Sequence, residues 1–293
     1  MSNTTVSLRR KIKSAGGLQS VVRTMKALAV SSIGQYEQAV RALGDYNYTV
    51  ELGLAAFLRE HGSVALIPKK KKQMDNGIIG VVVFGSDQGL VGQFNDVAAD
   101  YTIKTMSDRI GKAKVWTVGE RVHSRLKEAG LQIAGLFPVP NSVKAITPLI
   151  DQILIESDKH RLDELHLFYN RPVLKAVYEP VTQKLLPLDA NWRGRLTVTP
   201  WPTENLPEVM GTETTILQAL IREYLFVSLF RACAESLASE NASRLAAMYR
   251  ADKNIDELLE GLNGKFHRMR QNGIDEELFD VISSFEALNM EGK

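Results

Sequence analysis

Two long stretches of this chain contain no proline and carry apolar side chains at alternating steps of three and four residues. The first runs from Val6 to about Glu60, and the second from Thr212 to about Leu288. Such steps place side chains on one face of a helix, and a narrow apolar stripe is typical of a coiled coil. At about 1.5 Å per residue the two helices would be roughly 80 Å and 115 Å long. Neither fits inside a compact domain, so we expect an antiparallel pair in which the second helix projects beyond the first.

The apolar stripe of the first helix has steps of four and three, with one doubled four. It comprises Leu18, Val22, Met25, Ala29, Ile33, Tyr36, Val40 and Leu43. The stripe of the second helix comprises Ile255, Leu259, Leu262, Phe266 and Met269, and resumes at Leu278, Ile282 and Phe285. Glycines inside the first helix, among them Gly16, Gly17 and Gly34, each cost roughly 1 kcal/mol relative to alanine. Contacts with a partner helix must therefore hold it together.

Between the two long helices, strand signals alternate with helical ones. Strands are predicted at 78–84, 115–118, 164–169 and 176–186, and helices at 97–106, 120–128 and 143–155. This alternation favours a parallel sheet covered by helices. The predicted fold class is α/β, with a small, mostly parallel α/β domain inserted between two long helices that form an antiparallel coiled coil.

We expect three segments in chain order, none of which inserts into a membrane or contains a disulfide. Residues 1–62 form the N-terminal coiled-coil helix, 75–200 a Rossmann-like α/β domain and 211–293 the C-terminal coiled-coil helix; the run Pro68 to Lys72 is expected to be an exposed connection. The longest apolar runs are far shorter than the ~20 residues of a membrane-spanning helix, so no direct membrane insertion is expected. One cysteine, Cys233, excludes an internal disulfide and is interpreted as a small core residue.

Charge is distributed unevenly although the net charge is only +2. The first 30 residues hold six basic side chains and no acidic ones, whereas residues 251–293 carry ten acidic and five basic side chains. Opposite excesses suggest that the two ends lie side by side, and two solvated helical faces are the alternative interpretation.

The one segment that resembles a chemical motif is the glycine-rich run from Gly85 to Asn95, after the first predicted strand. A turn of this kind can bind phosphate through backbone N–H groups. However, no Gly-Lys-Ser/Thr follows and the spacing differs from the dinucleotide fingerprint, so a structural turn or a partner contact is favoured.

The five histidines lack metal-ligand spacing, and Asp275-Glu276-Glu277 is interpreted as a charged surface. We therefore predict no catalytic residue, no cofactor, no metal site and no nucleic-acid partner.

Three segments carry motifs of one known family. Leu8-Arg9-Arg10-Lys11-Ile12-Lys13-Ser14, then Gln19 and Thr24-Met25-Lys26-Ala27-Leu28-Ala29, is similar to the N-terminal helix of ATP synthase gamma subunits. The glycine-rich turn resembles the turn of that family. The most specific match is Leu237-Ala238-Ser239-Glu240-Asn241-Ala242-Ser243-Arg244-Leu245-Ala246-Ala247-Met248. The resemblance covers nearly the whole chain.

The resemblance implies a non-catalytic, rotating central stalk of an F-type ATP synthase. Its partners would be the alpha and beta subunits of the catalytic hexamer, the epsilon subunit and the membrane ring of c subunits, at the cytoplasmic face of the bacterial inner membrane. By the same resemblance, Arg270 and Gln271 would contact a loop of a catalytic subunit, and Met25 and Lys26 would lie near acidic loops of those subunits.

The chain also departs from the family at several motif positions. Gln88 and Val91 replace the arginine and cysteine of the turn, and Asp275 and Glu276 replace neutral residues after Arg270-Gln271. These changes are typical of a divergent branch, for example a second, alternative ATPase with its own partners. Two other function classes stay open: a coiled-coil adaptor without a rotary role, and a nucleotide-binding α/β protein.

Overall fold

The computed structural model describes residues 4–61, 77–107, 109, 113–160, 162–173, 176–188, 190–205 and 212–290. Its contacts divide the chain into two compact units. One comprises Met1–Leu28 with Leu245–Lys293 and is called the helix-pair unit; the other comprises Ala29–Arg244 and is called the sheet unit. Both long helices contribute to both units, and each unit is described by itself.

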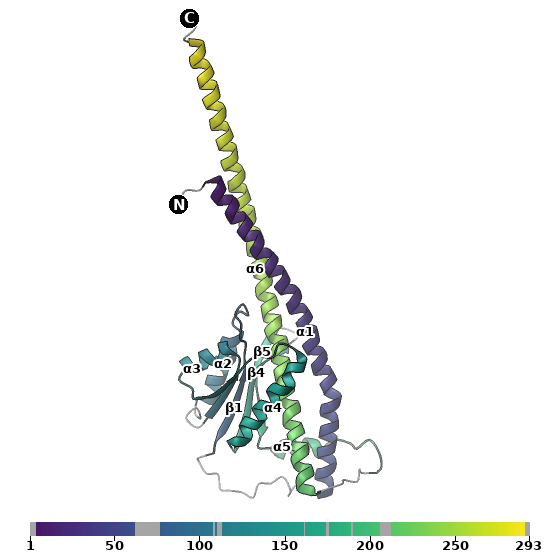
Figure 1. Cartoon of the computed structure of the whole chain (residues 1–293). Coiled ribbons are helices and arrows are strands. Elements are labelled where there is room, and N and C mark those ends of the chain that lie inside the picture. The colour runs from purple at the N-terminus through teal and green to yellow at the C-terminus, as the bar shows by residue number, and fades with distance from the viewer. Residues whose placement is uncertain are drawn as a thin grey trace. The chain divides into compact units, whose positions relative to one another are not determined.

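The two long proline-free stretches are helices, α1 (Thr5–His61) and α6 (Glu213–Met290) (Figure 1). Thr212 precedes α6, and its hydroxyl oxygen accepts a hydrogen bond from the Thr215 backbone N–H at 3.4 Å. This contact makes Thr212 the N-cap, as its position before the apolar pattern predicts.

The sheet unit holds five strands in the order β3-β2-β1-β4-β5. The elements between the long helices are β1 (Ile79–Phe84), α2 (Phe94–Met106), β2 (Ala113–Val118), α3 (Glu120–Glu128), β3 (Ile133–Phe137), α4 (Val143–Lys159), β4 (Glu164–Val173), β5 (Ala176–Leu186) and α5 (Ala190–Val198). β1 pairs in parallel with β2 and β4, and β2 with β3, whereas β5 runs antiparallel to β4. The predicted fold class, a mostly parallel α/β sheet between two long helices, is confirmed.

Alternate side chains of β1 enter two different cores, because successive residues of a strand point to opposite faces. Val81 and Val83 pack with residues of α2 and α3, including Val122 and Leu126. On the other face lie α4 and the long helices, and Cys233 of α6 is buried there as predicted. The sheet is therefore covered on both faces, as a largely parallel sheet requires.

A third core joins the long helices to α5, which the sequence did not predict. Leu54 and Leu58 of α1, Trp192 and Leu196 of α5 and Tyr224 of α6 are members of one buried cluster. In the sheet unit α1 and α6 also meet through a hydrogen bond from the Tyr46 hydroxyl to Glu223, at 2.7 Å.

The helix-pair unit contains an antiparallel pairing, and it corrects the predicted stripe at Leu18 and at Met25. Arg9 lies over the ring of Phe266, whereas Lys26, later in α1, contacts Asp252, earlier in α6. Leu18 was predicted to face the partner helix, but its side chain is 58% exposed. The positions that face the partner helix, which we call the seam, are taken by the next residues, Gln19 in place of Leu18 and Lys26 in place of Met25. The facing residues therefore follow an uninterrupted four-three spacing.

Two elements, β3 and α5, were not predicted from the sequence, and the predicted helix at 97–106 begins three residues earlier. The run Pro68 to Lys72 lies outside the described residues. The division into segments 1–62, 75–200 and 211–293 stays a prediction.

Candidate partner interface and the joint beside the glycine-rich turn

The four predicted contact residues all belong to the helix-pair unit but lie in two places. Met25 is half-buried on α1, and Lys26 beside it is turned toward α6. Arg270 and Gln271 are exposed and lie farther along α6 than Phe266, the residue paired with Arg9 near the start of α1. The structure therefore does not bring the two pairs together.

Lys26 makes intrachain contacts. Its ammonium nitrogen lies 2.8 Å from Oδ2 of Asp252 and 4.1 Å from the ring centroid of Tyr249. Its side chain is only 20% exposed. The contact of Lys26 with a partner stays a prediction, and in this structure its charge is balanced within the chain.

The last part of α6 carries large apolar side chains that are exposed. From residue 274 to 284 every side chain is exposed. The large apolar members, between 45% and 69% exposed, are Ile274, Leu278, Phe279, Val281 and Ile282. Clustered apolar side chains on a surface mark an interaction site. This segment, which also carries Asp275-Glu276-Glu277, therefore has the chemistry of a partner-binding surface.

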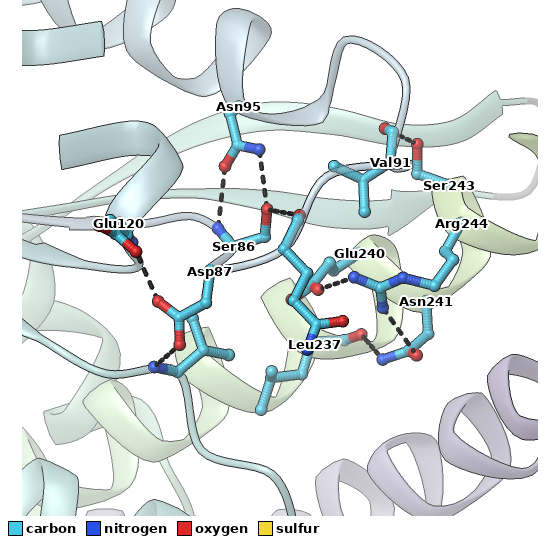
Figure 2. Close-up of polar contacts among 12 residues, drawn as sticks. Ser86, Asp87, Val91, Asn95, Glu120, Leu237, Glu240, Asn241, Ser243 and Arg244 are labelled. Atoms are coloured by element: carbon cyan, nitrogen blue, oxygen red, sulfur yellow. Dashed lines mark hydrogen bonds and ion pairs between the residues drawn. The ribbon is translucent and has the colours of Figure 1, made fainter. Parts of the chain in front are cut away.

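The glycine-rich turn after β1 is closed by its own hydrogen bonds (Figure 2). The Asn95 side chain accepts a hydrogen bond from the Ser86 backbone N–H at 2.9 Å and donates one to the Ser86 hydroxyl at 2.8 Å. The Ser86 hydroxyl in turn donates to the Gln88 carbonyl. The donors nearest the strand end are thus satisfied inside the turn, which supports the structural interpretation of this motif.

Two glycines allow the strand ends to approach closely at this turn. A Cβ on Gly85 would lie 2.4 Å from Cγ1 of Val122, and a Cβ on Gly119 would lie 2.7 Å from the Ser86 nitrogen. Gly119 also has a φ of 112°, which residues other than glycine rarely adopt. Only glycine fits at either position without a displacement of its neighbours.

Asp87 ties the turn to two other segments. Its carboxylate accepts hydrogen bonds from the backbone N–H groups of Glu120, at the start of α3, and Val139, at 3.0 and 2.9 Å (Figure 2). A carboxylate at a helix N-terminus is favoured by the helix dipole. Asp87 therefore helps to hold the turn in place.

The motif of α6 from Leu237 to Met248 packs against this turn. The Ser243 hydroxyl donates to the Val91 carbonyl at 2.6 Å (Figure 2). Nearby, the Arg244 guanidinium lies 2.5 Å from the Glu240 carboxylate and 3.3 Å from Asn241 Oδ1. Burial raises the pKa of the Glu240 carboxyl, although Arg244 opposes the shift. We call the residues Ser86, Asn95, Glu240, Ser243 and Arg244 the joint.

Both motifs are recognisable in the sequence, but their contact is not. The one sequence feature that relates to this contact is the run of serine, glutamate and asparagine residues in the α6 motif. Polar side chains of this kind on a helix are usually expected to be exposed to solvent. Ser239 and Glu240 are 0% and 5% exposed, so the run lies inside the sheet unit. Buried polar side chains need hydrogen-bond partners, and the turn supplies the Val91 carbonyl as the partner of Ser243.

Comparisons with known proteins agree with these observations. A family model described as ATP synthase matches residues 4–288. The ATP synthase gamma chain of Nautilia profundicola is 25% identical over 291 residues, which cover 96% of this chain and 97% of that relative. The gamma chain of a Cyanothece species is 28% identical over 318 residues, which cover 96% and 98%.

Solved structures share the fold. A chain of Euglena gracilis mitochondrial ATP synthase, solved as OSCP/F1/c-ring in rotational state 3, has a TM-score of 0.65 at 16% identity and covers 99% of this chain and 96% of its own. A chain of the central stalk and c-ring of the Tetrahymena thermophila mitochondrial enzyme has a TM-score of 0.56 at 21% identity, with 79% and 99% covered.

Proposed function

Because this chain belongs to the ATP synthase gamma-chain family, we propose that it transmits torque between an ion-driven membrane ring and a catalytic hexamer. Its role is that of the rotary central-stalk subunit of an F-type ATP synthase. The chain itself is non-catalytic in this proposal. A shaft does work by favouring different conformations of the surrounding catalytic sites at each orientation, and only the difference in affinity shifts their populations.

The proposed partners are those implied by the family: the alpha and beta subunits of the hexamer, the epsilon subunit and the ring of c subunits. No described helix has the length and apolar character needed to cross a bilayer. We propose that the chain is held peripherally at the cytoplasmic face of the bacterial inner membrane through these partners. We propose that the chain is divided into three functional segments: the helices of residues 1–62 and 211–293 and the α/β domain of residues 75–200.

The observation that carries the contact proposal is the exposed part of α6. Arg270 and Gln271 are exposed at the start of a segment whose apolar side chains, Phe279 among them, are exposed as well. We propose that Arg270 and Gln271 form a polar catch on one catalytic subunit at a time. Arginine suits this role because its planar guanidinium grips a carboxylate at two points. Met25 and the neighbouring Lys26 are proposed to lie near the same subunits.

The test replaces both catch residues by alanine in the assembled complex. A hydrogen bond to a charged group contributes about 1.5 to 3 kcal/mol, so losing one that forms only in a rotational intermediate should slow ATP hydrolysis by about ten- to a hundredfold. Ion pumping should fall with it. Both residues are exposed, so their truncation opens no cavity and the complex should still assemble.

Two further variants sharpen the result. Arg222→Ala removes an exposed arginine from α6 within the sheet unit and should leave hydrolysis unchanged. Asp275→Ala/Glu276→Ala tests whether these carboxylates supply substitute contacts. If both double variants assemble and hydrolyse ATP at the parental rate, this segment is a passive bearing and the catch assignment is wrong.

A further inference from the structure

Polar side chains form a cluster between α1 and α6 in the helix-pair unit. Lys26 Nζ lies 2.8 Å from Asp252 Oδ2. The Gln19 side-chain amide donates to Asp252 Oδ1 at 3.4 Å and also to Asp256 Oδ1. We call Gln19, Lys26, Asp252 and Asp256 the polar clasp.

Three of these residues occupy seam positions, where a coiled coil usually places apolar side chains. On α1 the seam has four-three spacing and comprises Leu8, Ile12, Ala15, Gln19, Val22 and Lys26. On α6 it comprises Met248, Asp252, Ile255, Leu259, Leu262 and Phe266. The clasp therefore replaces apolar contacts at the centre of the pairing instead of adding charges at its edge.

The Lys26–Asp252 ion pair of the clasp is partly shielded from water. The side chains of Lys26 and Asp252 are 20% and 15% exposed. A second cation, Arg23, lies 3.7 Å from Asp252 but is 63% exposed. The hydrogen bond from Lys26 lowers the pKa of the Asp252 carboxyl. A shielded charge that loses its counter-ion is strongly unfavourable, whereas replacing both charges by apolar groups often is not.

The apolar contribution beside the clasp is small. Between Gln19 and the start of α1, the seam offers one alanine, Ala15, and the larger Leu8 and Ile12; between Gln19 and Lys26 it offers only Val22. Both Leu18 and Val21, the large side chains next to the seam, are more than half exposed. Apolar burial is therefore a weak source of attachment between Gln19 and Lys26, whereas nearer the start of α1 Leu8 is 3% exposed.

From these contacts we propose that Lys26 and Asp252 are positioning residues, and that the polar clasp decides whether the N-terminal segment of α1 is held on α6. The attachment is releasable by ions in solution, unlike an apolar seam. The clasp acts within the chain before any partner binds, so it goes beyond the proposed rotary role and is tested on the full chain alone.

The test is hydrogen exchange of the purified full chain, measured by mass spectrometry. Lys26→Met should make amides of residues 5–28 exchange about tenfold faster, because Asp252 loses its main counter-ion. Residues 29–61 of the same helix serve as an internal control and should be unaffected. The matched control is Lys253→Met, since Lys253 is 79% exposed and lies 3.9 Å from Glu257. Lys26→Arg keeps a cation and should retain most of the protection.

A change of salt concentration and a double substitution distinguish an effect of the clasp on exchange from an effect of general packing. Raising salt from about 0.1 M to 1 M shortens the Debye length from about 10 Å to about 3 Å, so exchange of residues 5–28 should accelerate in the parental chain. Lys26→Leu/Asp252→Leu, which turns the clasp into an apolar layer, should remain protected and lose this salt response. Equal exchange in Lys26→Met and Lys253→Met, or an unchanged salt response in the double variant, would overturn the proposal.

Discussion

Replacing Arg244 by methionine should destabilise the sheet unit strongly. The Arg244 guanidinium is the ion-pair partner of the Glu240 carboxylate at 2.5 Å, and the two side chains are 13% and 7% exposed. Methionine keeps much of the length of arginine but removes its charge. Breaking a buried ion pair by removing one partner typically costs about 3 to 5 kcal/mol, because the other charge stays buried without compensation. We expect a loss of about this size at neutral pH.

The loss should depend on pH, and its sign follows from Glu240. Burial already raises the pKa of this carboxyl, and Arg244 lowers it. Without Arg244 the folded-state pKa rises further above the value of about 4.3 in the unfolded chain. The folded state then binds more protons than the unfolded state between these two values, so its stability is fully present below the unfolded pKa and falls as pH rises through the folded one. The deficit of Arg244→Met should therefore be smaller at about pH 5 than at about pH 8.

Urea unfolding followed by tryptophan fluorescence measures this deficit, because Trp116 and Trp192 are both buried in the sheet unit. The control is Glu240→Gln/Arg244→Met, in which glutamine cannot ionise. Its stability should lack the additional pH dependence of Arg244→Met, in which each tenfold change in the proton affinity of Glu240 corresponds to about 1.36 kcal/mol. A deficit that is equal at both pH values, or smaller than about 1 kcal/mol, would refute the role assigned to the buried pair.

Two further substitutions test the turn by the same unfolding assay. Gly119→Ala should cost more than about 3 kcal/mol, because the new Cβ meets the Ser86 nitrogen at 2.7 Å and φ is 112°; Gly130→Ala, with φ of 84° but nothing within 4 Å, should cost only about 1 kcal/mol. Asn95→Ala should cost about 1 to 3 kcal/mol, because it leaves the buried Ser86 N–H without its acceptor. The exposed Thr105→Ala is its control and should change stability by less than about 0.5 kcal/mol. Equal losses within either pair would contradict the packing described for the turn.

The sequence predicted the elements whose patterns are local and missed those that depend on tertiary contacts. The long helices were predictable from the periodicity of their apolar residues, and the buried strand at 79–84 from its uninterrupted apolar run. By contrast β3, an edge strand with alternating half-buried and exposed residues, includes Gly135 and has a weak strand signal. Likewise α5 contains Gly194 and is held by burial of Trp192 against the long helices, which no local pattern encodes.

The candidate site was predictable only in part. Family resemblance pointed to Arg270 and Gln271, and their exposure fits that prediction without testing it. The apolar spacing placed Leu18 and Met25 in the seam, because a search for apolar residues cannot recognise Gln19 and Lys26 as seam residues. Their partner, Asp252, lies more than two hundred residues away in the sequence. Only the three-dimensional pairing shows that these polar side chains satisfy one another.

Burial of Cys233 has a practical consequence for experiments that follow the rotation of this subunit. Its thiol is 1% exposed, and burial raises its pKa well above the usual range. The thiolate is the reactive form of cysteine, so this side chain should be nearly inert to maleimide reagents while the sheet unit is folded. A cysteine introduced on an exposed face can therefore carry a fluorophore or a bead as the single label. The native residue can stay in place, and the core that surrounds it need not be altered.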